Sequence, residues 1–334
     1  MPTRDVAGTL ARAMDVPLQF VVGKGGVGKS TVTAALALRA ASRGLRTLVV
    51  EFGGAGGVAR LFNQESLATG QLSILAPRLT LLALAGDEAL AEYLRMVVPI
   101  KRVLALVFQS RLYRVFVDGA PGLKELMTVG KVWYESNRRM ADGEPVWQRI
   151  FVDAGASGHS LQYLQMPAAA TATFRSGLVH REAARVQSML ADPSRTCVHV
   201  VATPEEMPVT EACSIVARLR DSLHLPIGTL FMNRTRDAVP DGAHDALARL
   251  DRLPPPANGR DALRDLLRQA VDAAIEWQGV QSAAIARIEA ETGLPAFRLP
   301  LIATEEFGRA EAGQLAAMLP DDSPTAPDAA GVEK

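Results

Sequence analysis

One glycine-rich segment, GKGGVGKST at residues 23–31, constrains this chain more than any other feature. It fits the pattern GxxxxGK[ST], follows an apolar run at 18–22 and precedes a helical pattern at 31–42. Glycines let the backbone wrap closely around phosphates, and the N-terminus of the next helix adds favourable positive charge. The segment therefore predicts a strand, a phosphate-binding loop and a helix, with a nucleotide contacted by Gly23, Gly25, Gly26, Val27, Gly28, Lys29, Ser30 and Thr31.

Two side chains of this loop have specific chemistry. Lys29 is expected to reach the β and γ phosphates, and the hydroxyl of Ser30 is expected to coordinate Mg²⁺. ATP and Mg²⁺ are thus the predicted cofactors. Lys24 directly follows the first glycine, which is the variant form of the loop called the signature-lysine form; the alternative is a solvated lysine at the loop entrance.

The rest of the chain predicts an α/β fold. Seven short apolar runs, most of them followed by a helical pattern, predict a doubly wound, mostly parallel sheet of the P-loop NTPase type. The runs lie at 18–22, 47–50, 79–84, 150–152, 197–201, 227–232 and 297–301. Residues 1–17 are a lead-in, 18–319 form the ATPase domain, and 320–334 are a tail whose composition favours disorder.

Three stretches are longer than the connections that such a sheet needs. Residues 87–148 and 162–190 are predicted to form an all-helical subdomain inserted into the sheet domain. Further helices are predicted at 262–291, after a proline-rich linker at 253–260.

Composition excludes several classes of protein. Lys and Arg number 36, as do Asp and Glu, so the chain lacks the overall basic charge that nucleic-acid binding would favour. The two cysteines, Cys197 and Cys213, form no CxxC pair, which argues against a disulfide framework, a zinc site or an iron–sulfur cluster. No apolar run reaches the ~20 residues of a membrane span, and the first residues are unlike a secretory signal. A cytoplasmic protein without an integral membrane segment is expected.

A second motif resembles a known family. Residues 150–167, IFVDAGASGHSLQYLQMP, resemble the switch segment of the ArsA and Get ATPases, which include the arsenite-pump subunit and the tail-anchored-protein targeting factor. Weaker similarities are EYL at 92–94, APGLKELMTVGKVW at 120–133, VVATPEEMPVTEA at 200–212, GTLFMNR at 228–234 and LPLIATEEFG at 299–308. Together these cover about 18–319. The resemblance implies a nucleotide-gated homodimer that closes on ATP, with Lys24 contacting phosphate across the interface.

The resemblance also implies roles for single residues. Asp153 would hold the water shell of Mg²⁺, and Gly158 and His159 would belong to the switch that senses the γ phosphate. Asn233 would hydrogen-bond adenine. The alternatives are a surface histidine at His159 and a turn-capping asparagine at Asn233. Glu211 is predicted to open a helix at 211–223, where it could be a simple first-turn acid.

The chain departs from the family at the first switch. Gly53 stands where the family has the Asp that positions the attacking water. Glu51 is the nearest acid, but two positions along a strand span about 6.5 Å, so it is no simple substitute. The glycine at this position has three interpretations. Hydrolysis is slow, or a different loop path brings in Glu51, or the protein needs a partner for hydrolysis. The chain also lacks the thiols of the arsenite pump and has one phosphate loop rather than two fused halves.

Three functions compete. The first is a dimeric ATP-driven switch that handles a hydrophobic or membrane-protein client, with residues 94–127 and 166–189 as the client surface; alternatively these positions are subdomain core. The second is an ATP-binding regulator with little hydrolysis that acts through a protein partner. The third, a spatial-organisation ATPase of the ParA or MinD type, is disfavoured by the neutral charge and the GHS segment at 158–160.

Overall fold

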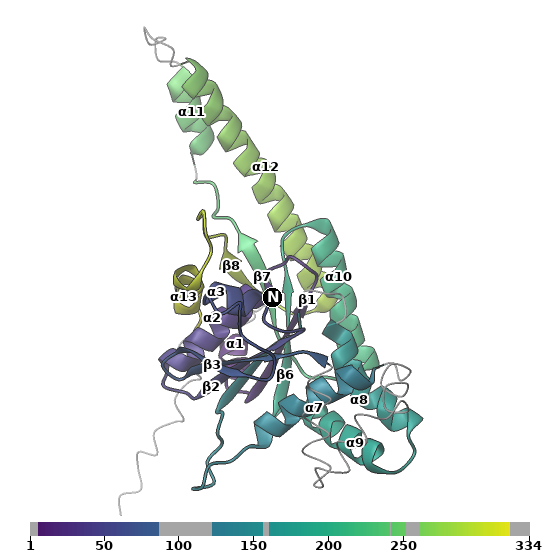
Figure 1. The fold of residues 1–334 in the computed structure, drawn as a ribbon. Coiled ribbons are helices and arrows are strands. Elements are labelled where there is room, and N and C mark those ends of the chain that lie inside the picture. Colours follow the sequence, from purple (N-terminus) through teal and green to yellow (C-terminus); the bar gives the residue numbers. More distant parts are fainter. Residues whose placement is uncertain (1–5, 87–121, 156–159, 241, 252–260, 321–334) are drawn as a thin grey trace, which may run out of the picture.

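A computed structural model describes residues 6–86, 122–155, 160–240, 242–251 and 261–320. Within these ranges the chain folds into an eight-stranded sheet in the order β3-β4-β2-β5-β1-β6-β7-β8, covered by helices on both faces (Figure 1). All seven predicted runs are strands: β1 (Leu18–Gly23), β2 (Thr47–Phe52), β4 (Leu79–Leu84), β5 (Arg149–Asp153), β6 (Thr196–Ala202), β7 (Ile227–Thr235) and β8 (Ala296–Pro300). The predicted doubly wound, mostly parallel sheet is therefore confirmed.

The strand that sequence analysis missed is β3 (Leu72–Ala76), which pairs antiparallel with β4 at the edge of the sheet. Its residues are not a continuous apolar run, and Leu72 and Ile74 are exposed. An edge strand has a neighbour on one side only and can leave one face in water, so the pattern that marks a central parallel strand is missing.

Different helices pack on the two faces of the sheet. On one face, α1 (Val6–Met14), α2 (Lys29–Ser42), α3 (Gly57–Leu61) and α13 (Arg309–Ala317) enclose a core that includes Val21, Phe151 and Phe231. On the other, α7 (Leu123–Asn137), α8 (Ser160–Thr173), α9 (Leu178–Ala191) and α10 (Glu206–Ala217) pack over Phe20 and Val152. Alternate residues of β1 and β5 point to opposite cores, as the period of a strand requires.

One predicted helix boundary is wrong. The helix predicted at 211–223 begins instead at Glu206 and ends at Ala217, followed by a π-helical turn, η1 (Arg218–Ser222). Pro208 lies in the first turn of α10, where the missing N–H of proline has no helical partner to lose. Glu211 therefore lies inside α10, not in its first turn.

The predicted helical stretches are described in part. Helices α7, α8 and α9 pack on one another around Leu126, Met127 and Ala183. These residues and Met189 are buried, so at these positions the apolar stretches form core rather than a client surface. Residues 87–121, 252–260 and 321–334 lie outside the described residues, and with them the linker predicted at 253–260 and all of the predicted tail except Pro320. The division of the chain into a sheet domain and a helical subdomain stays a prediction.

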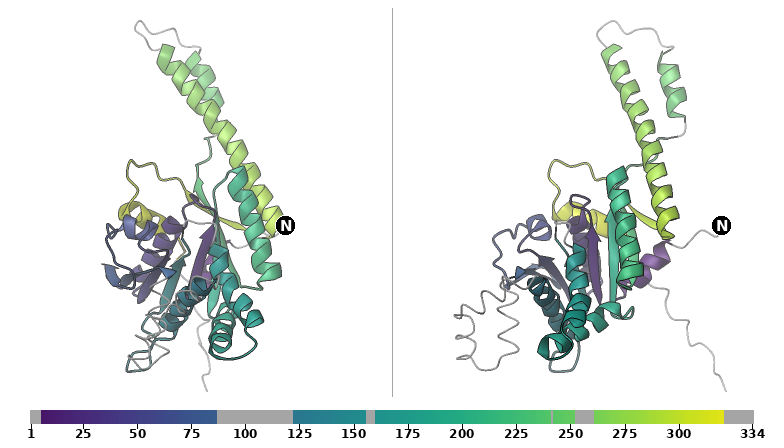
Figure 2. Two further views of the ribbon diagram at one scale, coloured as in Figure 1. Left: turned by 45° about the vertical axis from the view of Figure 1, so that its right-hand side comes forward. Right: turned by 90° about the vertical axis from the view of Figure 1, so that its right-hand side faces the viewer.

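A long helical arm projects from the sheet (Figures 1 and 2). It consists of α11 (Ala243–Asp251) beside the N-terminal half of α12 (Asp261–Thr292), whereas the C-terminal half of α12 packs against α10. The arm carries exposed apolar side chains, with Leu266 62% and Val280 46% accessible. No helix in the described ranges is long and apolar enough to cross a membrane.

A histidine lies in the centre of the sheet. The N–H of Thr229 donates to Nδ1 of His199 at 3.0 Å, so the ring proton is on Nε2, which lies 2.9 Å from Oε1 of Gln19. His199 is completely buried, and burial lowers its pKa to about 4. The neutral ring is thus the form that the fold requires.

The lowered pKa of His199 predicts that the free energy of unfolding falls in mild acid. Since its pKa is about 4 in the fold against 6.5 when exposed, the unfolded chain takes up the extra proton as pH falls from 6.5 to 4. The contribution lost is about 3 kcal/mol. Urea unfolding at several pH values should show this loss in the wild type but not in His199→Gln. Buried acids with raised pKa values, such as Asp153 and Glu51, stabilise the fold as pH falls, and the difference between the two unfolding free energies cancels their contribution. The half-buried His180→Gln is the control, and equal slopes in all three proteins would refute the assignment.

Candidate functional site

The predicted phosphate loop lies at the carboxyl end of β1, a central strand. It leaves the strand at Gly23 and enters α2 at Lys29. Gly26 and Gly28 have φ of 87° and 92°, which side chains rarely adopt. An added Cβ would lie 2.3 Å from the carbonyl oxygen of Val201 at Gly23, and 2.2 Å from Nδ2 of Asn233 at Gly28. The first and last glycines of the loop are thus required by close neighbours as well as by backbone conformation.

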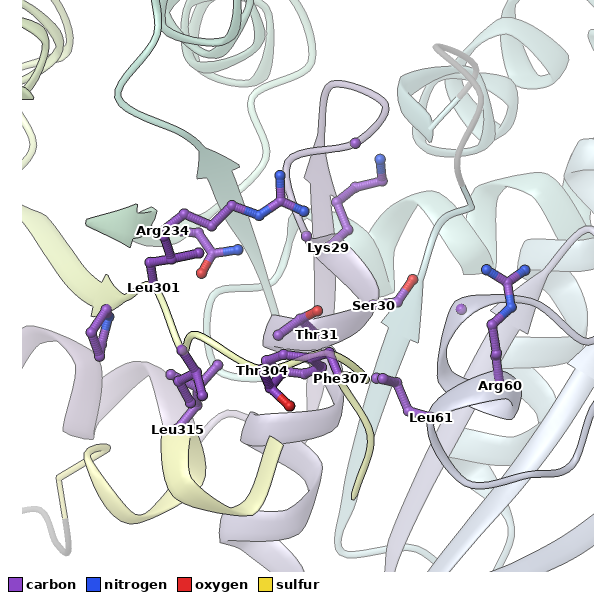
Figure 3. A pocket seen from close by; sticks show the side chains of 16 residues that line it. Lys29, Ser30, Thr31, Arg60, Leu61, Arg234, Leu301, Thr304, Phe307 and Leu315 are labelled. Atoms are coloured by element: carbon purple, nitrogen blue, oxygen red, sulfur yellow. The ribbon is translucent and has the colours of Figure 1, made fainter. Parts of the chain in front are cut away.

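Lys29 is held at the first turn of α2. Its Nζ donates to the carbonyl oxygen of Lys24 at 2.9 Å, which closes the loop on itself. Burial lowers the pKa of Lys29, while the negative charges of Asp153 and Glu211 raise it. The side chain of Lys29 is drawn beside the pocket in Figure 3. Lys24 itself is half-buried at the rim of the loop.

Ser30 and Asp153 meet although they are 123 positions apart. The hydroxyl of Ser30 donates to Oδ2 of Asp153, which ends β5, the strand next to β1. Burial raises the pKa of Asp153, whereas hydrogen bonds from Ser30 and the N–H of Gly155 and the charge of Lys29 lower it. A hydroxyl beside one carboxylate fits Mg²⁺, which prefers oxygen ligands and takes the remainder from water and phosphate.

Asn233 supports the loop from a distant strand. It lies in β7, and its Nδ2 donates to the carbonyl oxygen of Val27 at 2.8 Å. The alternative of a turn-capping asparagine is therefore wrong, because the residue is inside a strand. Sequence analysis did not predict the contact with Val27, since nothing local to either residue signals a partner 206 positions away.

A cavity of about 510 Å³ opens beside the loop (Figure 3). One end is lined by loop residues and Ser30, and the other by apolar side chains of the segment between β8 and α13. The full lining is Gly26, Gly28, Lys29, Ser30, Thr31, Gly57, Arg60, Leu61, Asn233, Arg234, Pro300, Leu301, Ile302, Thr304, Phe307 and Leu315. A polar phosphate end and an apolar end suit a nucleotide. Arg60 and Arg234 were missed by sequence analysis, although Arg234 directly follows Asn233.

The glycine-rich segment at 53–57 borders this cavity. The N–H groups of Gly53 and Gly54 donate to the carbonyl oxygen of Leu84 at 2.8 and 3.1 Å, with φ of 90° and 96°. Nothing lies within 4 Å of a Cβ added at Gly53. Glu51, the nearest acid, accepts hydrogen bonds from α3. In this loop path neither residue provides the missing carboxylate.

The structure thus brings most predicted residues together. Lys29, Ser30 and Asp153 converge at the mouth of the loop, with Asn233 behind it. Gly158 and His159 lie outside the described residues, so their predicted role in a switch stays a prediction. The described residues hold no group of three or more His, Cys, Asp or Glu side chains arranged to bind a metal ion. A site that combines Ser30, Asp153 and phosphate needs no such group.

Comparison with known proteins identifies relatives. A family model described as anion-transporting ATPase matches residues 17–181. The chain is 32% identical over 235 residues to ATPase BagA of Mycobacterium tuberculosis, covering 67% of this chain and 66% of that protein, just under two thirds of its length. It is 31% identical over 156 residues to an arsenical pump-driving ATPase of Escherichia coli and 28% over 253 residues to one of Acidiphilium multivorum. These matches cover 46% and 70% of this chain, but 26% and 41% of the two relatives.

Proposed function

Since the chain belongs to the ArsA family of P-loop ATPases, we propose that it binds ATP with Mg²⁺ and hydrolyses it as a homodimer that closes on the nucleotide. The observation that carries the proposal is the meeting of the Ser30 hydroxyl and the Asp153 carboxylate at the mouth of a glycine loop. The relatives named for arsenical pumps support ATP use, not arsenite transport, because this chain has only Cys197 and Cys213.

Each residue of the site has a task in this proposal. The backbone N–H groups of the loop and the start of α2 bind the phosphates, and Lys29 neutralises charge on the β and γ phosphates. Ser30 and Asp153 would hold Mg²⁺ and its water shell. When bound, the cation would withdraw charge from the transferring phosphoryl group. The apolar residues Leu301 and Phe307 would enclose the base at the far end of the cavity.

Turnover is expected to be slow. No carboxylate faces the loop from Gly53, and the acid two positions earlier is engaged by α3. Positioning of the attacking water would then depend on backbone groups or on a second protein. The same observation supports the alternative function, an ATP-bound regulator that signals through a protein partner. A hydrophobic client would belong to the first proposal only. In the described ranges 122–137 and 166–189, the large apolar side chains that are exposed are Tyr134 and Phe174.

The arm supports the homodimer. Leu266, Ala270, Ala273, Trp277 and Val280 are spaced four and three residues apart along α12, which places them in one stripe. All except Trp277 are exposed. In an antiparallel pair of α12 helices, Ala270 would face Ala273, and Leu266 would lie opposite position 277 of the second copy, where the Trp277 ring stacks with Arg236 of its own chain. The pairing also sets the arginines at 264 and 268 near the acids at 272 and 276.

The test is single-turnover hydrolysis with enzyme in excess of labelled ATP, together with light scattering to measure mass. We expect Mg²⁺-dependent release of phosphate that EDTA abolishes, and a dimer mass with ATP. Leu266→Glu should weaken the dimer, whereas Ser282→Glu, which adds the same charge at an exposed position of α12 outside the stripe, should not. Binding of ATP without cleavage would favour the regulator, and failure to bind ATP would refute both functions.

A further inference from the structure

Glu51 is a buried acid that the proposed hydrolysis does not use. It lies in β2, in register with Asp153 on β5, and is 2% exposed. Its neighbours along the strand, Val49 and Val50, are apolar and completely buried. Burial raises the pKa of Glu51, and the nearby Asp153 raises it further. A buried carboxylate is costly unless hydrogen bonds compensate it, so its partners are informative.

The partners are three backbone N–H groups at the start of α3. The N–H of Val58 donates to Oε1 at 2.6 Å, and those of Ala59 and Gly56 donate to Oε2 at 3.0 and 3.1 Å. These bonds fix the end of the segment 53–57, GGAGG, which contains four glycines and is costly to order. Its other end is held by the carbonyl oxygen of Leu84.

The segment ends directly against the predicted magnesium position. A Cβ added to Gly57 would lie 2.2 Å from Oγ of Ser30 and 2.5 Å from its Cβ. Ser30 is therefore enclosed between Gly57 on one side and Asp153 on the other. Any shift of the start of α3 changes the space around the hydroxyl that is proposed to coordinate the cation.

We infer that Glu51 is a positioning residue that holds Gly57 against Ser30 and thereby shapes the magnesium position. It acts through the backbone of α3 and does not contact the nucleotide. The inference rests on the proposed function, because it concerns the same site. It also gives a reason why an acid stands at position 51 among buried apolar residues: its two oxygens together accept the three N–H groups that fix the glycine segment.

The test compares Glu51→Ala and Glu51→Gln with Glu135→Gln, a matched control. Glu135 is also a buried carboxylate, but its partners are Lys131, Arg138 and Trp147 in and near α7. We expect Glu51→Ala to raise amide hydrogen exchange at Val58 and Ala59 by about fivefold or more, the factor that a lost hydrogen bond of roughly 1 kcal/mol corresponds to. The Mg²⁺ concentration for half-maximal turnover should rise about tenfold, with ATP affinity in EDTA unchanged. Glu51→Gln, which keeps one acceptor, should be intermediate.

A second variant acts on the other side of the contact. Gly57→Ala keeps Glu51 but forces α3 away from Ser30, so it should raise the Mg²⁺ concentration for half-maximal turnover as Glu51→Ala does. The inference is overturned if both variants keep the wild-type Mg²⁺ dependence. If the wild type binds ATP but does not cleave it, turnover cannot serve as the readout. The readout is then the protection of the Val58 and Ala59 amides from hydrogen exchange when Mg²⁺ is added with a non-hydrolysable ATP analogue. Wild-type protein that binds no ATP would instead refute the proposed function.

Discussion

Asp153→Asn should lower the single-turnover rate of ATP hydrolysis by about two orders of magnitude or more. The substitution keeps the shape of the side chain but removes the charge that is proposed to pair with Mg²⁺ beside Ser30. ATP binding in EDTA should change little, because the loop glycines and Lys29 remain. The measurement is phosphate release with enzyme in excess over ATP, at saturating Mg²⁺ and in EDTA.

The variant is expected to fold. Burial raises the pKa of Asp153, which means that the fold opposes the ionised form, and a neutral asparagine removes that cost. Asp221→Asn, at an exposed acid in η1, is the control and should hydrolyse ATP at the wild-type rate. A folded Asp153→Asn protein with wild-type turnover would show that the cation is held elsewhere.

Gly28→Ala should weaken ATP binding by about a hundredfold. Two effects combine at this position: φ is 92°, which costs an alanine ~1–2 kcal/mol, and the added Cβ would lie 2.2 Å from Nδ2 of Asn233. Relief of that clash breaks the hydrogen bond from Asn233 to Val27 and moves the end of the loop away from the phosphates. The measurement is titration with a fluorescent ATP analogue.

Gly26→Ala separates the two effects. Its φ of 87° gives a similar strain, but nothing lies within 4 Å of the added Cβ. Gly44→Ala, with φ of 82° and equally open space near the end of α2, tests strain outside the loop. We expect both to bind ATP within about tenfold of the wild type. If Gly26→Ala and Gly28→Ala weaken binding equally, the contact with Asn233 has no part in shaping the loop.

The strands could be predicted because most are buried on both faces. A residue run such as 18–22 or 197–201 is apolar throughout only where helices cover both sides of a sheet. The edge strand at Leu72 and the start of α10 before Pro208 could not be found this way. In the first case one side of the strand meets water, and in the second a residue that usually ends helices occupies a position where it is tolerated.

Some residues of the candidate site could likewise be predicted from the sequence, and others could not. The phosphate loop could be predicted because its glycines, Lys29 and Ser30 lie within nine consecutive residues, so local backbone conformation is nearly sufficient to build it. The role of Asp153 needed a resemblance to known ATPases as well as its place after a strand. The capping role of Glu51 was not predicted: sequence analysis weighed it as a substitute for a missing acid, and the structure shows it bound to α3.

The sheet, the phosphate loop and the resemblance to the ArsA ATPases could all be recognised from short runs of neighbouring residues. The contacts of Asp153 with Ser30, of Asn233 with Val27 and of Gly57 with the Ser30 hydroxyl arise from the folding of the whole chain. Parallel strands end at one edge of a sheet whatever their separation in the chain, and the order of the strands decides which ends become neighbours. That order is set by how the helices pack on both faces, which no single segment of sequence contains.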